Sequence, residues 1–157
     1  MIQIPGFPDY YVDGTDIVSM KFGKRRVMKD NVNNVGYAQV ALRNKGSKPH
    51  WKLKHRLIAQ AYLKDYADHL IVDHIDRDIT NNHISNLRLA NKSQNAQNTK
   101  RQHKGYRWHN NAKAWQARIK LNGKEINLGF FNTEDEAHAA YLAAKVIYHT
   151  HYTPEIT

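Results

Sequence analysis

The stretch IVDHIDRDITNNHISNLRLANKSQNAQN, residues 71–98, holds the polar residues that decide both the fold and the chemistry of this chain. Asp73 and His74 are adjacent. Asn86 lies twelve residues after the histidine, and Asn95 lies nine residues further on. A carboxylate, an imidazole and two amides in this order can hold one hard metal ion and activate one water molecule beside a phosphate. The stretch therefore predicts phosphodiester hydrolysis, and we interpret the chain as a nuclease.

The same stretch has the pattern strand, loop, strand, helix. The apolar run 70–72 predicts a first strand and residues 87–89 predict a second. Asn91 can cap a helix together with Gln94 three residues later, which is a capping-box arrangement. This helix is expected to run to about Arg101.

The residue types assign chemical roles to this pattern. Two strands that end near the start of a helix can bring Asp73, His74 and Asn95 into one pocket. Asp73 and Asn95 would supply hard oxygen ligands, which favours one Mg²⁺ or Mn²⁺ ion over zinc. His74 would be the general base, and Asn86 could hydrogen-bond the backbone of the loop behind it. Because neighbours on a strand face opposite ways, the strand must end or twist at Asp73 and His74.

The charge of the chain points to a polyanionic partner. Lys plus Arg number 24 against 14 Asp plus Glu, which gives a net charge of +10 at pH 7. Residues 21–56 contain eleven basic residues and one acid, and residues 92–124 contain nine basic residues and no acid. Residues 65–78 between them contain five acids. We expect the two basic flanks to bind nucleic acid around a central metal site. The alternative is a basic protein whose charged faces are merely solvated.

Several classes of protein are excluded by the composition. The chain has no cysteine, so disulfides and Cys-based zinc sites are excluded. The first residues lack a basic region followed by an apolar run, and no apolar run approaches the roughly 20 residues needed to span a bilayer. We therefore expect a soluble, cytoplasmic protein.

Three modules are expected, with an α+β fold. Residues 1–52 predict a small antiparallel β module, with Asp13-Gly14 as one of its turns. Residues 53–101 combine an amphipathic helix with the strand–strand–helix pattern. Residues 102–157 predict a three-stranded antiparallel sheet, with a hairpin at Asn122-Gly123, packed on one helix.

The helix of the last module has a clear start and a predicted apolar face. Thr133 can cap it, with Glu136 at the third position. Its apolar face is expected to consist of Ala137, Ala140, Tyr141, Ala144, Ile147 and Tyr148.

The central segment resembles the HNH nuclease family, which has the ββα-metal fold, and in particular the homing endonucleases of phages and introns. The matching motifs are His55-Arg56-Leu57, Asp73-His74-Ile75-Asp76, Asn81-Asn82, Asn86-Leu87-Arg88, Asn95 and Asn98. The resemblance implies that His74 is the general base, Asn86 supports the loop and Asn95 binds the metal. The family is named for a second histidine where this chain has Asn95. That variant occurs in the homing subgroup and goes with a single Mg²⁺ or Mn²⁺ ion.

The C-terminal residues 104–149 resemble the Apetala/ethylene-response-factor DNA-binding domain. The matching residues are Gly105, Trp115, Ala117, Ile119, Gly123, Leu128-Gly129, Phe131, Glu136-Ala137 and Ala140-Tyr141. In that family the sheet lies in the major groove and its exposed side chains contact bases and phosphates. The resemblance implies DNA contacts by Lys104, Arg107, His109, Arg118, Lys120 and Asn127. The family often has an acid at position 118 and a basic residue where this chain has Glu125, so the base preference does not carry over. The alternative is a solvated sheet face.

The N-terminal part resembles, more loosely, the small β module that precedes HNH domains in phage nucleases. The matching residues are Tyr10-Tyr11-Val12, Gly14 and Gly36-Tyr37. The predicted phosphate contacts are Lys21, Lys24, Arg25, Arg26 and, on the following helix, Arg56. The alternative is a structural sheet with a basic rim.

These features together predict a site-specific HNH homing endonuclease that acts on double-stranded DNA in a bacterial host cell, if it is phage-encoded. One constellation per chain predicts nicking by a monomer, with a dimer as the alternative. Family chemistry implies 5′-phosphate and 3′-hydroxyl ends. The second hypothesis is a sequence-specific DNA-binding regulator with an inactive nuclease core. A nuclease that degrades host DNA without sequence preference is a third.

Overall fold

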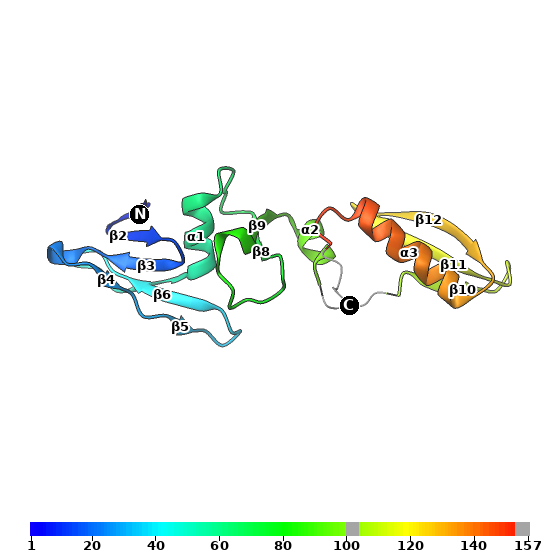
Figure 1. Cartoon of the computed structure of the whole chain (residues 1–157), viewed down its shortest axis with the longest axis horizontal. Coiled ribbons are helices and arrows are strands. Elements are labelled where there is room, and N and C mark those ends of the chain that lie inside the picture. Colours follow the sequence, from blue (N-terminus) through cyan, green and yellow to red (C-terminus); the bar gives the residue numbers. More distant parts are fainter. Residues whose placement is uncertain (100–103, 153–157) are drawn as a thin grey trace. The chain divides into compact units, whose positions relative to one another are not determined.

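The computed structural model describes residues 1–99 and 104–152, and it divides into two structural units, Met1–Ala90 and Asn91–Thr157 (Figure 1). Both contain small antiparallel sheets together with helices, which confirms the predicted α+β class. The observed division differs from the predicted boundary at 52/53, and the predicted boundary at 101/102 lies outside the described residues. The division into three functional modules stays a prediction.

The first unit begins with two antiparallel sheets. The first sheet contains, in this order, β1 (Ile2–Ile4), β2 (Phe7–Asp13), β3 (Asp16–Ser19) and β4 (Arg26–Val27). The second contains β5 (Asn31–Val32), β6 (Ala38–Leu42) and β7 (His50–Leu53). The predicted turn at Asp13-Gly14 joins β2 to β3, and a tight turn, η1 (Lys21–Gly23), separates β3 from β4.

Helix α1 (Lys54–Tyr62) lies at the centre of this unit and contacts strands of both sheets and the strand pair that follows (Figure 1). Its stripe of Leu57, Ile58 and Ala59 is buried, as the amphipathic pattern predicts. One hydrophobic core joins all these elements; besides the stripe it includes Ile4, Phe7, Tyr10, Val12, Ile17, Val40, Leu42, Val72 and Leu87. The core is therefore continuous across residues 52 and 53.

Two strands carry the central polar motif. β8 (Ile71–His74) pairs antiparallel with β9 (Leu87–Ala90), and the 3₁₀ turn η2 (Ile84–Asn86) precedes β9. The register sets Asp73 opposite Arg88 and His74 opposite Leu87. β8 ends at His74, so Asp73 and His74 both still belong to the strand. Their convergence on one site stays a prediction.

The second unit begins with helix α2 (Lys92–Gln97), whose predicted capping box between Asn91 and Gln94 is present in both directions. The helix ends at Gln97, so the expected extension to Arg101 is wrong for the described residues, and Arg101 itself lies outside them. The N–H of Asn98 bonds the carbonyl of Asn95 at 3.1 Å, and this tighter three-residue closure ends the helix.

The rest of the second unit is a three-stranded sheet covered by one helix (Figure 1). The sheet contains β10 (Tyr106–His109), β11 (Ala114–Leu121) and β12 (Lys124–Phe131), in this order. The predicted hairpin at Asn122-Gly123 joins β11 to β12. Helix α3 (Glu134–Tyr148) begins with the predicted capping box of Thr133 and Glu136.

Helix α3 buries a shorter face than the sequence predicts. Ala137, Tyr141 and Ala144 are buried, and Tyr141 and Ala144 pack on Ile119 of β11. Ile147 is 72% exposed and Tyr148 is also exposed, so the buried face of the helix ends at Ala144. Gly105 is required beside the helix, since a Cβ there would collide with the ring of Tyr141. Within residues 1–99 and 104–152, no helix is long and apolar enough to cross a membrane.

Candidate active site

Asp73 and His74, at the end of β8, are both buried. The Oδ2 atom of Asp73 accepts a hydrogen bond from Nε of Arg88, its neighbour across the strand pair, at 2.8 Å. His74 instead contacts residues of α1, the loop after β8 and the segment before β6. The two side chains therefore leave the strand in different directions, as neighbours on a strand do.

The imidazole of His74 has a specific hydrogen-bond partner in Asn82. The two atoms, Nε2 of His74 and Oδ1 of Asn82, lie 3.1 Å apart. Nδ2 of Asn82 donates to the carbonyl of Thr80 at 3.3 Å, which fixes the orientation of the amide. If the amide were flipped, its oxygen would face the carbonyl oxygen of Thr80 and no hydrogen bond could form there. An amide oxygen can only accept, so Nε2 of His74 carries the proton and the neutral ring has its lone pair on Nδ1.

Two further rings surround His74. The ring of buried His55 on α1 lies 5.2 Å from that of His74, edge to face. Tyr37 lies 5.1 Å from His55 and 6.2 Å from His74, centroid to centroid. The sequence predicted no role in the site for His55, Tyr37 or Asn82. The Asn81-Asn82 motif was the available signal for Asn82; nothing local in the sequence points to Tyr37.

The loop after His74 is held by Asn86. Its Oδ1 accepts from the N–H of Asp76 at 3.0 Å, and its Nδ2 donates to Oδ1 of Asp76 at 2.8 Å and to the carbonyl of Asn81 at 2.9 Å. Burial acts to raise the pKa of Asp76, but hydrogen bonds from the Asp78 N–H, Asn81 and Asn86 outweigh it and hold that pKa below its usual value. Asn86 thus holds a loop rather than the imidazole itself, and its catalytic role stays a prediction.

His55 makes the stability of the first unit depend on pH. Burial, followed by the nearby His74 and Arg56, lowers the pKa of His55 from 6.5 to about 4. Between these two values the unfolded chain binds more protons than the folded one. The free energy of unfolding should therefore fall by up to roughly 3 kcal/mol as the pH drops from 6.5 to 4. Denaturant unfolding across that range measures the effect.

The matched control for this prediction is an exposed histidine. His55→Gln should flatten the pH dependence, whereas His69→Gln, at an exposed position, should leave it as in the wild type. Parallel stability curves for the wild type and His55→Gln would contradict the assignment.

The predicted metal ligands belong to different units, with Asp73 on β8 and Asn95 on α2. Their joint coordination of one ion therefore stays a prediction. Both are oxygen donors, so the donor set suits Mg²⁺ or Mn²⁺. Within the described ranges no group of three or more His, Cys, Asp or Glu residues could hold a metal. The pair Asp73 and Asn95 contains only one residue of these types, so this finding does not bear on it.

The predicted N-terminal DNA contacts lie on or beside the turn between β3 and β4, except Arg56. Lys24, Arg25 and Arg26 are exposed, and Arg25 pairs with Asp13 at 2.9 Å. Arg56 is engaged internally: its guanidinium donates to the carbonyls of Leu70 and Asp68, both at 3.0 Å, and to the Tyr66 hydroxyl at 2.8 Å. This leaves Arg56 a weaker candidate for a phosphate contact, which stays a prediction.

The predicted C-terminal contacts lie on one face of the β10–β12 sheet, except Lys104, which precedes β10. Ala117 and Ile119 are buried, so the alternate residues of β11 face away from α3. The residues on that outer face are Arg107, His109, Gln116, Arg118, Lys120, Glu125, Asn127 and Phe130. Five of the six predicted contacts are therefore side by side. Their contact with DNA stays a prediction.

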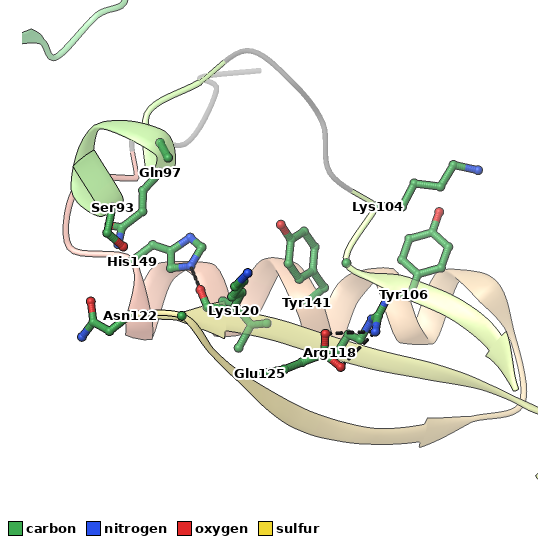
Figure 2. Close-up of a pocket in the computed structure, with 14 residues that line it drawn as sticks. Ser93, Gln97, Lys104, Tyr106, Arg118, Lys120, Asn122, Glu125, Tyr141 and His149 are labelled. Atoms are coloured by element: carbon green, nitrogen blue, oxygen red, sulfur yellow. Dashed lines mark hydrogen bonds and ion pairs between the residues drawn. The ribbon is translucent and has the colours of Figure 1, made fainter. Parts of the chain in front are cut away.

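Arg118 does not stand alone on this face. Its Nη1 donates to both carboxylate oxygens of Glu125, each at 2.9 Å. Figure 2 draws both contacts as dashed lines. Arg118 and Glu125 line a cavity of about 530 Å³, together with Lys104 and Lys120. Nearby, Gln116 accepts from Arg107 at 3.4 Å and donates to Asn127 at 3.3 Å. These bonds fix several side chains of the outer face in position.

The central segment of the chain is similar to known proteins. Residues 52–97 match the family model described as HNH endonuclease. Over 98 residues the chain is 34% identical to DNA endonuclease I-HmuI of Bacillus phage SP01. This match covers 61% of this chain and 55% of that protein. A solved structure titled "DNA binding and cleavage by the HNH homing endonuclease I-HmuI" is similar with a TM-score of 0.54 and 31% identity. The similarity covers 60% of this chain and 53% of the other. The chain thus spans about half the length of the relative it matches.

Proposed function

We propose that this chain, whose residues 52–97 form an HNH endonuclease domain, is a site-specific DNA endonuclease that hydrolyses phosphodiester bonds with one divalent metal ion. The observation that carries the proposal is the buried His74, whose Nε2 lies 3.1 Å from Oδ1 of Asn82, at the end of a strand inside the matched segment. The similarity to a phage homing endonuclease supports DNA as the substrate.

In this mechanism Nδ1 of His74 takes a proton from a water molecule, and the resulting hydroxide attacks the scissile phosphorus in line. The rings of His55 and Tyr37 and the amide of Asn82 fix the direction of the imidazole. Asp73 and Asn95 would hold one Mg²⁺ or Mn²⁺ ion. When bound, such an ion stabilises the negative charge that develops on the phosphate and on the leaving oxygen. The products would be 5′-phosphate and 3′-hydroxyl ends.

The basic flanks would bind duplex DNA on both sides of the cleavage site. The exposed cations Lys24, Arg25 and Arg26 support phosphate contacts by the N-terminal turn, and the outer face of the β10–β12 sheet supports contacts by the C-terminal part. One His74 per chain would cleave one strand at a time, so a monomer would nick. A double-strand break would need two sites or two events.

The test is to map the cleaved positions on both strands of supercoiled plasmid in the presence of Mg²⁺ or Mn²⁺. We expect nicks at defined positions on one strand. Staggered cuts on both strands would show a double-strand cutter, and cuts without sequence preference would show a general nuclease. Binding without any cleavage in either metal would support the DNA-binding regulator instead.

Arg118→Ala should weaken binding to the mapped target by about 1–3 kcal/mol, and the loss should depend on the base pair if Arg118 reads a base. Fluorescence anisotropy with the target and with single-base variants measures this. Lys124→Ala, which changes an exposed cation at the hairpin end of β12, is the matched control. The same loss on every sequence would make Arg118 a phosphate contact only.

A further inference from the structure

Phe22, at the tip of the turn between β3 and β4, has an unusual position for an aromatic residue. It is 97% exposed. Its backbone is left-handed, with φ 57° and ψ 31°, and Gly23 follows with φ 68°. The N–H of Lys24 bonds the carbonyl of Lys21 at 3.2 Å, which completes a turn with both central residues at positive φ. Such a turn strongly favours Asn or Gly at the first central position.

Phe22 is therefore not packed in a core, and it is not a residue type that this turn favours. A bulky residue at positive φ is an outlier that costs stability, and its ring gains nothing from burial. Observed strain and exposure at the same residue are typical of a position kept for a contact outside the chain.

The surroundings of Phe22 indicate what that contact is. Lys21, Lys24, Arg25 and Arg26 belong to the same turn and its flanks. Arg43 and Lys45, on the loop between β6 and β7, line a cavity of about 710 Å³ together with Phe22 and Lys21. The two loops are joined, since Nζ of Lys21 donates to the carbonyl of Arg43 at 2.6 Å. Two acids are close: Asp9 lines the cavity, and Asp13 pairs with Arg25. The balance is strongly positive.

We infer that Phe22 is a wedge that inserts between base pairs of duplex DNA while the surrounding cations hold the flanking phosphates. An exposed apolar side chain at the tip of a basic turn is the arrangement by which DNA-bending proteins unstack a base step. The cations supply attraction without sequence preference, and the ring supplies a local distortion. The inference rests on the proposed DNA binding, and it adds that the bound duplex is partly unstacked and unwound.

The substitution that separates this role from a structural one is Phe22→Asn. Asparagine suits the left-handed backbone of this turn, so the variant should unfold at a higher temperature than the wild type while it loses the wedge. Phe22→Leu keeps an apolar side chain and should retain the wedge. Ile147→Gln removes another exposed apolar residue, from α3, and is the matched control.

The measurement is DNA unwinding. Relaxed closed plasmid is incubated with the full chain and a metal-independent type I topoisomerase in EDTA, so that no cleavage occurs, and the topoisomers are resolved after the protein is removed. The wild type, Phe22→Leu and Ile147→Gln should shift the topoisomer distribution, and Phe22→Asn should not. Anisotropy on a 30-base-pair duplex, an arbitrary length of about three helical turns, should show roughly tenfold weaker binding for Phe22→Asn.

Two results would overturn the wedge. One is a wild-type chain that binds the duplex but leaves the topoisomers unchanged. The other is a Phe22→Asn variant that unwinds plasmid as the wild type does. A wild-type chain that binds no DNA at all would instead overturn the proposed function itself, together with the wedge.

Discussion

Replacing His74 by alanine is expected to lower the rate of plasmid nicking by about 10²–10⁴-fold, the usual contribution of a general base. DNA affinity should stay within a factor of a few, because His74 is buried and its contacts are with Asn82, His55 and Tyr37. Nicking is followed on supercoiled plasmid with Mg²⁺, and binding is measured by anisotropy in EDTA.

A buried ring in contact with other side chains also contributes to folding, so the loss of activity must be separated from instability. His74→Gln retains a polar side chain of similar reach and should fold, yet a glutamine amide is not a base at neutral pH and should be as inactive as alanine. His69→Ala, at an exposed position, should nick normally. Unchanged cleavage by folded His74→Gln would remove His74 from the mechanism.

DNA affinity should fall steeply with salt, because each phosphate neutralised by a cation releases bound counterions. A protein that makes about 6–10 phosphate contacts loses roughly 10³–10⁵ in affinity between about 50 and 200 mM salt. The exposed cations of the β3–β4 turn and of the β10–β12 sheet are numerous enough for this range. Anisotropy with one duplex over a salt series gives the slope of log affinity against log salt.

Single substitutions sharpen the salt prediction. Lys24→Ala should reduce the slope by about one if Lys24 contacts a phosphate. Arg56→Ala is the informative comparison, since the guanidinium of Arg56 already bonds Leu70, Tyr66 and Asp68. An unchanged slope for Arg56→Ala would assign it to the fold alone. A flat salt response of the wild type would contradict binding through basic surfaces.

The sequence correctly predicted the features that depend only on residues close to one another along the chain. Both capping boxes, at Asn91 and at Thr133, are present, because each needs only two residues three positions apart. The hairpin at Asn122-Gly123 is present for the same reason. The three-stranded sheet with one helix is also present, since the two-residue period of a strand follows directly from its backbone.

Contacts between distant segments could not be predicted in this way. Nothing in the sequence says that Tyr37 reaches His55 and His74, because that contact depends on how two sheets fold around α1. The loop offers several amides, and spacing alone does not tell that Asn82, rather than Asn86, bonds the imidazole. The role of Phe22 could not be predicted, because the alternation of apolar and polar residues describes strands and does not apply to a residue in a turn.

The single core around α1 determines what can be cut from this chain. The strand pair β8–β9 is too small to be stable by itself, as two-stranded sheets generally are, and its buried Val72 and Leu87 pack in the same core as Ile4, Val12 and other N-terminal residues. The residues of the predicted active site therefore do not form a module that can be transferred by itself. A fragment that starts at residue 52 would carry every HNH residue and lack the scaffold that shapes them. Fusions intended to retarget the proposed nuclease should retain residues 1–97, because the first unit ends at Ala90 and the predicted metal ligand Asn95 follows on α2.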